Sequence, residues 1–225
     1  MLFNSYAFVL FLPIVAVIYY ILPQKARSFW LLASSVYFYM CWNKYYVILL
    51  AITIATSYFA AKFLERYREQ KRFACKAVFV SAVTINLGFL FFYKYLGFFL
   101  TNLAAMLNLM NVSFKQPELN LILPVGISFY TFKAVSYLID VYRGKYCCTK
   151  NFIHYATYIS FFPAILSGPI DRANEFIPQL EEKHEFDYIT IRRGMLLMLW
   201  GYFLKLVVSD QTKSQGRTKY MLHNE

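Results

Sequence analysis

Charged residues are scarce in this sequence. Asp, Glu, Lys and Arg make up 16% of its 225 residues, against about 25% in a typical soluble domain. Hydrophobic residues account for 59%, and the chain contains 20 Tyr and 23 Phe. So many aromatic side chains do not suit a water-soluble surface, but they suit bilayer interfaces, where an apolar ring and a polar tip both find a favourable environment. The composition predicts a helical protein that crosses a membrane several times.

The sequence also lacks the cysteine patterns of metal and disulfide proteins. Its four cysteines, Cys41, Cys75, Cys147 and Cys148, contain no CxxC pair, and no Cys/His cluster has zinc spacing. We therefore expect no metal site and no bound cofactor. Cys147 and Cys148 are adjacent beside the end of an apolar run, so S-acylation is one alternative. Two reduced cytoplasmic thiols are the favoured interpretation, because neither spacing nor a partner supports more.

Signal-peptide and nucleic-acid features are missing as well. No basic residue precedes Lys25, no small-residue cleavage site is evident, and more apolar runs follow, so the first run is expected to stay as a membrane span. The formal net charge of +11 does not indicate a nucleic-acid partner. Lys and Arg cluster in short loops between apolar runs, as in membrane proteins, and no nucleic-acid-binding motif is present.

The spacing of the apolar runs predicts an all-α, polytopic membrane fold with about seven inserted segments. The second run is short for an untilted crossing, which needs about 20 residues. Residues 98–110 are expected to form an interfacial or partly inserted helix. The runs cover residues 6–22, 29–42, 45–61, 77–95, 121–142, 152–170 and 194–208.

Residues 62–76, KFLERYREQKRFACK, carry the strongest topological signal. This loop holds six Lys or Arg against Glu65 and Glu69. Cytoplasmic loops of membrane proteins are enriched in basic residues, so the loop is predicted to face the cytoplasm. Counting back three spans places the N-terminus outside the cell membrane.

The fifth apolar run is interrupted by polar residues and helix breakers. Pro124, Gly126, Ser128 and Lys133 all lie within it. Such groups survive at membrane depth only where protein or a water-filled cavity satisfies them. The run is therefore predicted to line the inside of the helical assembly. Lys133 is a functional candidate for a substrate path, with snorkelling to the headgroups as the alternative.

Asp140 and Arg143 lie three residues apart at the end of the same run. Residues with this spacing are neighbours on one helical face. A structural ion pair at the end of a span is favoured over a catalytic pair.

The sixth run contains Pro163, Gly168 and Pro169, so at least one broken or re-entrant segment is expected. Ser167, Gly168, Pro169 and Arg172 are predicted to form a turn that exposes backbone amides and a guanidinium. Such a turn suits an anionic acyl carrier or a sugar acid on a substrate path. A simple helix break, with Arg172 at the interface, is equally favoured.

Several segments resemble one known family. LPVGISFYTF and SYLIDVYRG, within residues 123–144, and FFPAILSGPIDR, residues 161–172, are similar to membrane-bound O-acyltransferases of the bacterial alginate O-acetylation type. Residues 1–23 and GYFLKLVVSD, residues 201–210, resemble this branch too. The similarity covers residues 1–210 as the N-terminal part of such a domain, and leaves residues 211–225 as an unassigned polar tail.

The resemblance implies an enzyme that transfers an acyl group, with acetyl favoured, to hydroxyls of an extracellular polysaccharide. It also implies an acyl thioester donor or carrier on the cytoplasmic side and an extracytoplasmic partner protein. The D-alanine transferases of teichoic acid belong to the same superfamily, so the acyl group stays open. A non-enzymatic membrane scaffold or transporter fragment is the alternative, because broken helices and buried polar residues suit transporters equally well.

No catalytic residue is assigned from the sequence. Acyl transfer to a hydroxyl needs a general base, a role that suits histidine. The resemblance places the family's catalytic histidine beyond the last motif present here. His154 lies near the start of the sixth run, His184 in a polar connector and His223 near the end of the sequence, so none of the three sits deep in an apolar run. We therefore expect the 225-residue chain to be inactive by itself.

Overall fold

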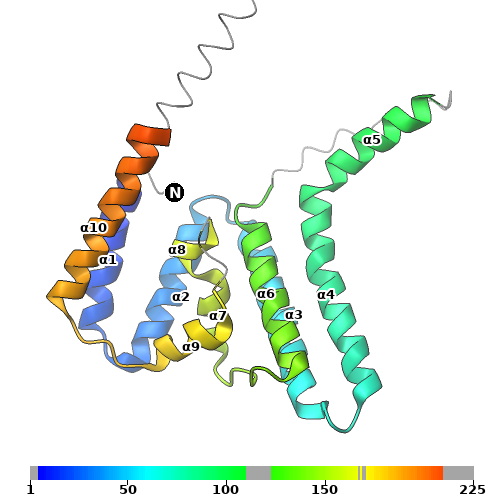
Figure 1. The fold of residues 1–225 in the computed structure, drawn as a ribbon, viewed down its shortest axis with the longest axis horizontal. Coiled ribbons are helices and arrows are strands. Elements are labelled where there is room, and N and C mark those ends of the chain that lie inside the picture. The colour runs from blue at the N-terminus through cyan, green and yellow to red at the C-terminus, as the bar shows by residue number, and fades with distance from the viewer. Residues whose placement is uncertain (1–4, 110–122, 167, 169–170, 210–225) are drawn as a thin grey trace, which may run out of the picture. The chain divides into compact units, whose positions relative to one another are not determined.

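A computed structural model describes residues 5–109, 123–166, 168 and 171–209, and all regular elements in these ranges are helices (Figure 1). The all-α prediction is confirmed for this part of the chain. The chain divides into two compact units. One spans Ile21–Lys183, and the other holds the described residues before and after it. The first unit contains α2 (Gln24–Met40), α3 (Tyr46–Tyr67), α4 (Arg72–Lys94), α5 (Leu96–Leu109), α6 (Ile127–Arg143), α7 (Phe152–Ser160), α8 (Phe162–Ile165) and α9 (Ala173–Glu181).

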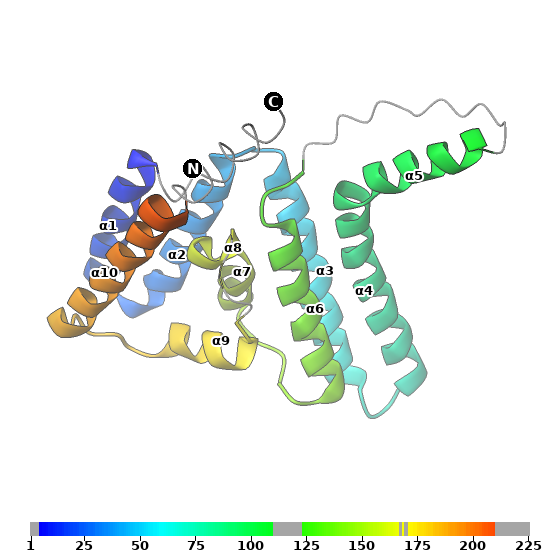
Figure 2. The same ribbon diagram turned by 45° about the horizontal axis from the view of Figure 1, so that its top comes forward.

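Helices α3, α4 and α6 pack side by side in the first unit (Figures 1 and 2). By length and composition, α3 and α4, with 22 and 23 residues, are apolar enough to cross a membrane. Helix α7 packs against α2, α3, α6 and α9. The core of this unit therefore lies among α2, α3, α6 and α7. The predicted total of about seven inserted segments stays a prediction.

Helix α6 is bounded by two glycines in the left-handed conformation. Gly126 precedes it with φ 74°, and Gly144 follows it with φ 71°. Glycine adopts positive φ without the steric cost of a side chain. The amide of Gly144 donates to the carbonyls of Asp140 and Val141, which closes the helix. In the described part of the fifth apolar run, from Leu123 onward, the helix thus begins at Ile127, later than the hydrophobicity predicts.

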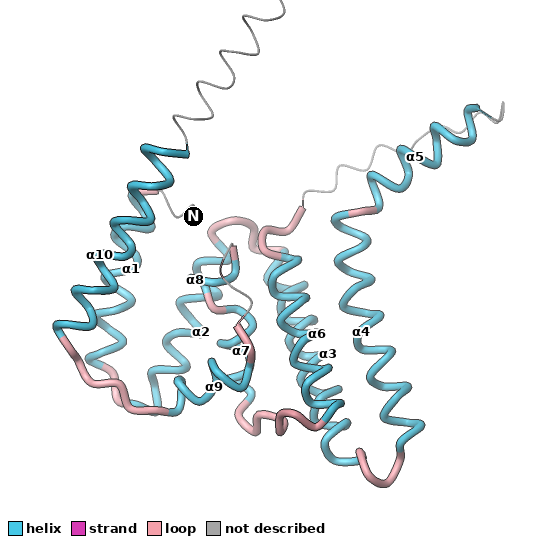
Figure 3. Tube along the Cα trace, in the orientation of Figure 1, coloured by secondary structure: helices cyan, strands magenta, loops and turns pink. Residues whose placement is uncertain are grey.

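The predicted loop 62–76 is mostly helical. Helix α3 continues to Tyr67 and α4 begins at Arg72, which leaves a short connection between them (Figure 3). Lys, Arg and Glu are good helix formers, and their long side chains carry charge away from the backbone into water. The charged residues of 62–76 show where the apolar runs end, but the helices α3 and α4 extend into this charged segment.

The predicted break in the sixth run is confirmed. Helix α7 ends at Ser160, and the short α8 follows after Phe161, with Pro163 in its first turn. Proline is tolerated at the start of a helix and disrupts its interior. A re-entrant path through the membrane remains a prediction. The polar connector that follows contains a helix that the sequence analysis did not anticipate, α9.

The second unit contains α1 (Tyr6–Ile21) and α10 (Tyr188–Phe203), followed by a π-helix at Leu204–Ser209. Helix α10 starts earlier than the seventh apolar run. Asp187 caps its N-terminus by accepting hydrogen bonds from the amides of Ile189 and Thr190. Helix α10 buries none of its side chains in the described structure.

Candidate functional site

Lys133 lies on α6 inside the first unit, with only 2% of its side chain exposed. Its Nζ is 3.8 Å from Oδ2 of Asp171. The rings of Tyr158 and Phe176 also face the ammonium, with centroids 5.2 and 5.8 Å from Nζ. A buried cation needs such compensation, here from one carboxylate and two aromatic faces. The snorkelling alternative does not fit a side chain this deeply enclosed.

Aromatic packing holds Asp171 in place beside the lysine. The hydroxyl of Tyr158 on α7 donates to the backbone carbonyl of Asp171 at 2.8 Å. Phe176 on α9 packs edge-on against Phe161 at 4.9 Å between ring centroids. The break between α7 and α8 and the start of α9 are therefore fixed around the Lys133–Asp171 pair.

No hydrogen-bond acceptor in the described ranges reaches Nζ of Lys133, because the Asp171 oxygen lies beyond hydrogen-bond distance. The ammonium has three donors. Lys133 is therefore held in the interior of the helical assembly by the nearby carboxylate and ring faces, without a hydrogen bond to its amine.

Tyrosines build a hydrogen-bonded interior next to this pair. Tyr155 is fully buried and its hydroxyl donates to Oγ of Ser57 at 2.7 Å. The ring of Tyr137 lies 4.5 Å from that of Tyr155, and its hydroxyl accepts the amide of Thr149 at 3.0 Å. Composition alone assigned the tyrosines to bilayer interfaces. Several of them instead line the protein core: Tyr39, Tyr130, Tyr137, Tyr155 and Tyr158.

The two adjacent cysteines occupy different environments after α6. Cys147 is exposed, whereas Cys148 is buried, and both are free thiols. The amide of Cys148 donates to Oε1 of Glu65 at 3.1 Å, and its sulfur accepts the hydroxyl of Tyr137 at 3.4 Å. Burial raises the pKa of the Cys148 thiol, which keeps it protonated and unreactive. If either thiol is S-acylated, Cys147 is the accessible one.

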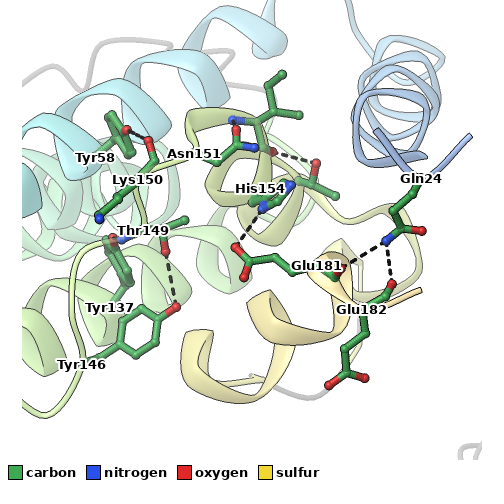
Figure 4. Close-up of polar contacts among 12 residues, drawn as sticks. Gln24, Tyr58, Tyr137, Tyr146, Thr149, Lys150, Asn151, His154, Glu181 and Glu182 are labelled. Carbon is green, nitrogen blue, oxygen red and sulfur yellow. Dashed lines mark hydrogen bonds and ion pairs between the residues drawn. The ribbon is translucent and has the colours of Figure 1, made fainter. Parts of the chain in front are cut away.

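Polar contacts fasten α9 to α7 and to the start of α2 (Figure 4). Nδ1 of His154 lies 3.3 Å from Oε1 of Glu181. The side-chain amide of Gln24 donates to the carbonyls of Glu181 and Glu182 at 3.3 and 2.6 Å. Asn151 caps α7 by accepting the amide of Ile153. His154 is thus a half-buried histidine that anchors a neighbouring helix, while His223 lies outside the described residues.

The predicted turn of Ser167, Gly168, Pro169 and Arg172 is described only in part. Ser167 and Pro169 lie outside the described residues. The amide of Gly168 donates to the carbonyl of Ala164 at 3.0 Å, and a Cβ at this position would overlap Ala164. Arg172 is exposed and directly follows Asp171. The sequence analysis missed Asp171, although an acidic residue immediately after a broken apolar segment was the available signal.

Asp140 and Arg143 do not form the predicted ion pair. The ion pairs closer than 4.0 Å among the described residues include Lys133–Asp171 and His154–Glu181, and Asp140 is not paired with Arg143 in this way. The i, i+3 spacing allows a contact but does not enforce one. Arg143 is exposed where α6 ends, so its guanidinium is free to be solvated. In the same part of the chain, no group of three or more His, Cys, Asp or Glu is arranged to hold a metal ion.

The described elements are all helices, two of them long and apolar, and they surround a buried lysine, which fits the class of helical membrane proteins. Sequence comparison gives the particular relationship. The peptidoglycan O-acetyltransferase of Helicobacter pylori is 31% identical over 246 residues, which cover 94% of this chain and 45% of the relative. The probable alginate O-acetylase AlgI of Pseudomonas aeruginosa is 29% identical over 100% of this chain and 43% of the relative. That of Azotobacter vinelandii is 29% identical over 93% and 42%.

These matches confirm the resemblance carried by the motifs: the chain is related to the alginate O-acetylation type of membrane-bound O-acyltransferases. The chain spans less than half the length of these curated relatives. No protein-family model matches it. No solved structure matches it either.

Proposed function

We propose that this chain forms the N-terminal portion of a membrane O-acyltransferase that transfers acetyl groups to hydroxyls of an extracellular polysaccharide. One observation carries the proposal. Relatives named for peptidoglycan and for alginate O-acetylation both match at least 93% of this chain. The two acceptors differ chemically, while acetyl transfer to a polysaccharide is common to both names.

Within that enzyme, Lys133 and Asp171 are proposed to act as positioning residues. Their contact ties α6 to the start of α9, directly beside the exposed Arg172. A guanidinium is a rigid fork that binds carboxylate or phosphate with two parallel hydrogen bonds. Arg172 would then meet the anionic part of an acyl carrier or of a sugar acid, in an orientation set by the buried pair.

The proposed orientation places the α3–α4 connection in the cytoplasm and the N-terminus outside. An acyl thioester donor would approach from the cytoplasmic side, and a partner protein with the polysaccharide acceptor from the other. The support is the six basic residues within 62–76, since cytoplasmic loops accumulate Lys and Arg.

The function is tested by deleting the gene in its native host and measuring ester-linked acetyl groups on the surface polysaccharide. We expect deletion to remove them and the intact gene to restore them. Unchanged O-acetylation would contradict the proposal and would favour a scaffold or transporter.

The positioning role is tested in the same cells with Lys133→Leu. Displacement of a substrate-binding group by about 1 Å can cost on the order of 10²-fold in rate, so we expect a loss of that order at equal protein level. Lys25→Leu, at an exposed position near the start of α2, is the matched control and should acetylate normally. Equal activity of both variants would leave Lys133 without a positioning role.

The orientation is tested by placing a cysteine at Glu69 in a background without other exposed cysteines. An impermeant thiol reagent added outside intact cells should not label it, and should do so once the membrane is opened. Labelling in intact cells would reverse the proposed topology.

A further inference from the structure

Three basic side chains converge on one pocket at the turn between α3 and α4. The pocket has a volume of about 550 Å³ and is lined by Arg68, Arg72 and Lys76 together with Phe73, Cys75 and Tyr142. None of these described lining residues carries a carboxylate. Glu65 and Glu69, the nearby acidic residues, line a second pocket, which shares Arg68 with this one. Like charges gathered around one space repel each other unless an anion lies between them.

This convergence is more than the basic composition of residues 62–76. Of the other basic residues there, Arg66 and Lys71 lie against the ring of Tyr67, at 5.7 and 5.3 Å from its centroid, and Lys62 is not among the lining residues. The orientation of a membrane protein depends on how many basic residues a loop contains. It does not depend on whether three of the six, Arg68, Arg72 and Lys76, line one cavity.

The end of α6 supports one wall of this pocket. The guanidinium of Arg68 lies against Gly144, where a Cβ would overlap it, and donates weakly to the carbonyl of Arg143 at 3.4 Å. Glycine at the end of α6 therefore makes room for the arginine. Gly144 lines the neighbouring pocket that Arg68 shares with Glu65 and Glu69. The contact restricts the Arg68 side chain, which would lose less entropy on binding an anion than a mobile surface arginine.

The N-terminus of α4 adds to the attraction for an anion. Its first turn contains no acidic residue, and Lys71 at the N-cap position makes no side-chain capping hydrogen bond. The first amides of a helix lack intrahelical acceptors and carry a partial positive charge. Phosphate groups bind readily at such positions, here directly beside Arg72.

The remaining walls are apolar. Phe73 is 88% exposed, and Tyr142 stacks on Phe79 with ring centroids 4.5 Å apart. The pocket lies at the turn where α3 ends and α4 begins. These are the two described helices that are long and apolar enough to cross a bilayer. Basic pockets at the ends of membrane helices bind phospholipid headgroups. A headgroup phosphate would meet the cations, while the glycerol and first acyl carbons would contact Phe73 and Tyr142.

We propose that this pocket binds the phosphate headgroup of an anionic phospholipid, of the phosphatidylglycerol type. The proposal is independent of the acyl-transfer function. It would fix the α3–α4 turn and the end of α6 against the membrane surface, and it assigns to residues 62–76 a defined lipid site in addition to a topological signal.

The test compares two triple variants with equal loss of charge. Arg68→Gln/Arg72→Gln/Lys76→Gln removes the pocket cations, and Lys62→Gln/Arg66→Gln/Lys71→Gln removes the other three basic residues of the loop. The full chain is placed in lipid nanodiscs of phosphatidylcholine with phosphatidylglycerol, extracted into mild detergent, and analysed for retained lipid by native mass spectrometry. Circular dichroism confirms that both variants are folded.

We expect the unmodified chain to retain phosphatidylglycerol over phosphatidylcholine. Three headgroup contacts at about 1 kcal/mol each correspond to roughly 100-fold in affinity, so the pocket variant should lose most of the retained lipid while the control keeps it. Equal losses in the two variants would show a diffuse charge effect and overturn the proposal. Failure of the unmodified chain to retain the lipid would overturn it as well.

A single variant separates a lipid from a soluble phosphate. Phe73→Ala keeps all three cations and alters a side chain that is almost fully exposed, so folding should be unaffected. If a phospholipid is the ligand, this variant retains less phosphatidylglycerol, and inorganic pyrophosphate added to the unmodified chain does not displace the lipid. Complete displacement by pyrophosphate, with no effect of Phe73→Ala, would show a simple phosphate site and contradict the lipid proposal.

Discussion

Helices α6 and α4 pack against each other and against α3, yet they differ in which side chains they bury and which they leave exposed. Helix α6 buries Tyr130, Lys133 and Tyr137 among other side chains. Helix α4 buries four residues along its length and leaves large apolar side chains such as Phe91 and Phe92 exposed. Helix α6 buries one face in protein, although its Phe132 is 45% exposed, and α4 presents mainly an apolar face of the kind that lipid covers. An apolar run in the sequence is therefore not enough to tell a lipid-facing helix from an interior one.

The partners of the buried polar groups show the same difference. Asn86 on α4 donates to the carbonyl of Ala82 in its own helix at 2.8 Å. Lys133 on α6 depends on Asp171, which belongs to a distant part of the chain. Interior polar groups on α6 hold separate elements together, whereas the buried amide of α4 bonds within its own turn.

The largest effect is expected from removing the partner of Lys133. Asp171→Ala leaves a buried ammonium without its carboxylate, and uncompensated buried charges typically cost about 3 kcal/mol or more. Because Asp171 is 34% exposed, we expect a loss near 3 kcal/mol, measured by unfolding of the chain in detergent. Glu175→Ala, an exposed carboxylate on α9, should change stability by less than about 0.5 kcal/mol. Equal effects would remove the distinction between interior and surface charges.

A smaller effect is expected from a pair of serines. Ser57→Ala on α3 removes the acceptor of the buried Tyr155 hydroxyl, and an unsatisfied buried donor costs about 1–3 kcal/mol. Ser81 on α4 is exposed and donates to the carbonyl of Val78 in its own helix. Ser81→Ala should therefore be nearly neutral in the same unfolding measurement. If Ser81→Ala destabilises the chain and Ser57→Ala does not, the assignment of Ser57 to the interior and of Ser81 to the exposed face is wrong.

The smallest effect is expected at the start of α10 and depends on pH. Hydrogen bonds from the Thr190 hydroxyl and from the amides of Ile189 and Thr190 hold the pKa of Asp187 below its usual 3.8. A carboxyl group whose pKa is lower in the folded state than in the unfolded state stabilises the fold at pH values above its unfolded-state pKa. This stabilisation is lost as the pH falls through its folded-state pKa. We expect the protection factors of the amides in the first α10 turn, which are exchange rates corrected for the intrinsic effect of pH, to fall as the pH drops through the folded-state pKa of Asp187. Asp187→Asn should abolish this pH dependence, whereas Glu182→Gln should leave it intact.

Local features of the sequence predicted much of the first unit. Pro163 correctly indicated a broken helix, and the polar residues around Lys133 correctly indicated an interior position. Other features needed the structure. Asp171 contacts Lys133 only because α7, α8 and α9 fold back onto α6, and hydrophobic periodicity carries no information about such distant contacts. The ends of α3 and α4 were also missed, because charged residues continue a helix as readily as they end an apolar run.

Labelling by a photoreactive lipid tests the contrast between α6 and α4 most directly. The chain is embedded in a bilayer that contains a lipid with a photoactivatable group in its acyl chain, illuminated, and mapped by peptide mass spectrometry. The account predicts labels on exposed α4 residues such as Val80, Ile85 and Phe92, and none on Tyr130, Ala134 or Tyr137 of α6. Labels on these three α6 residues, with the α4 residues unlabelled, would contradict the enclosed interior around Lys133.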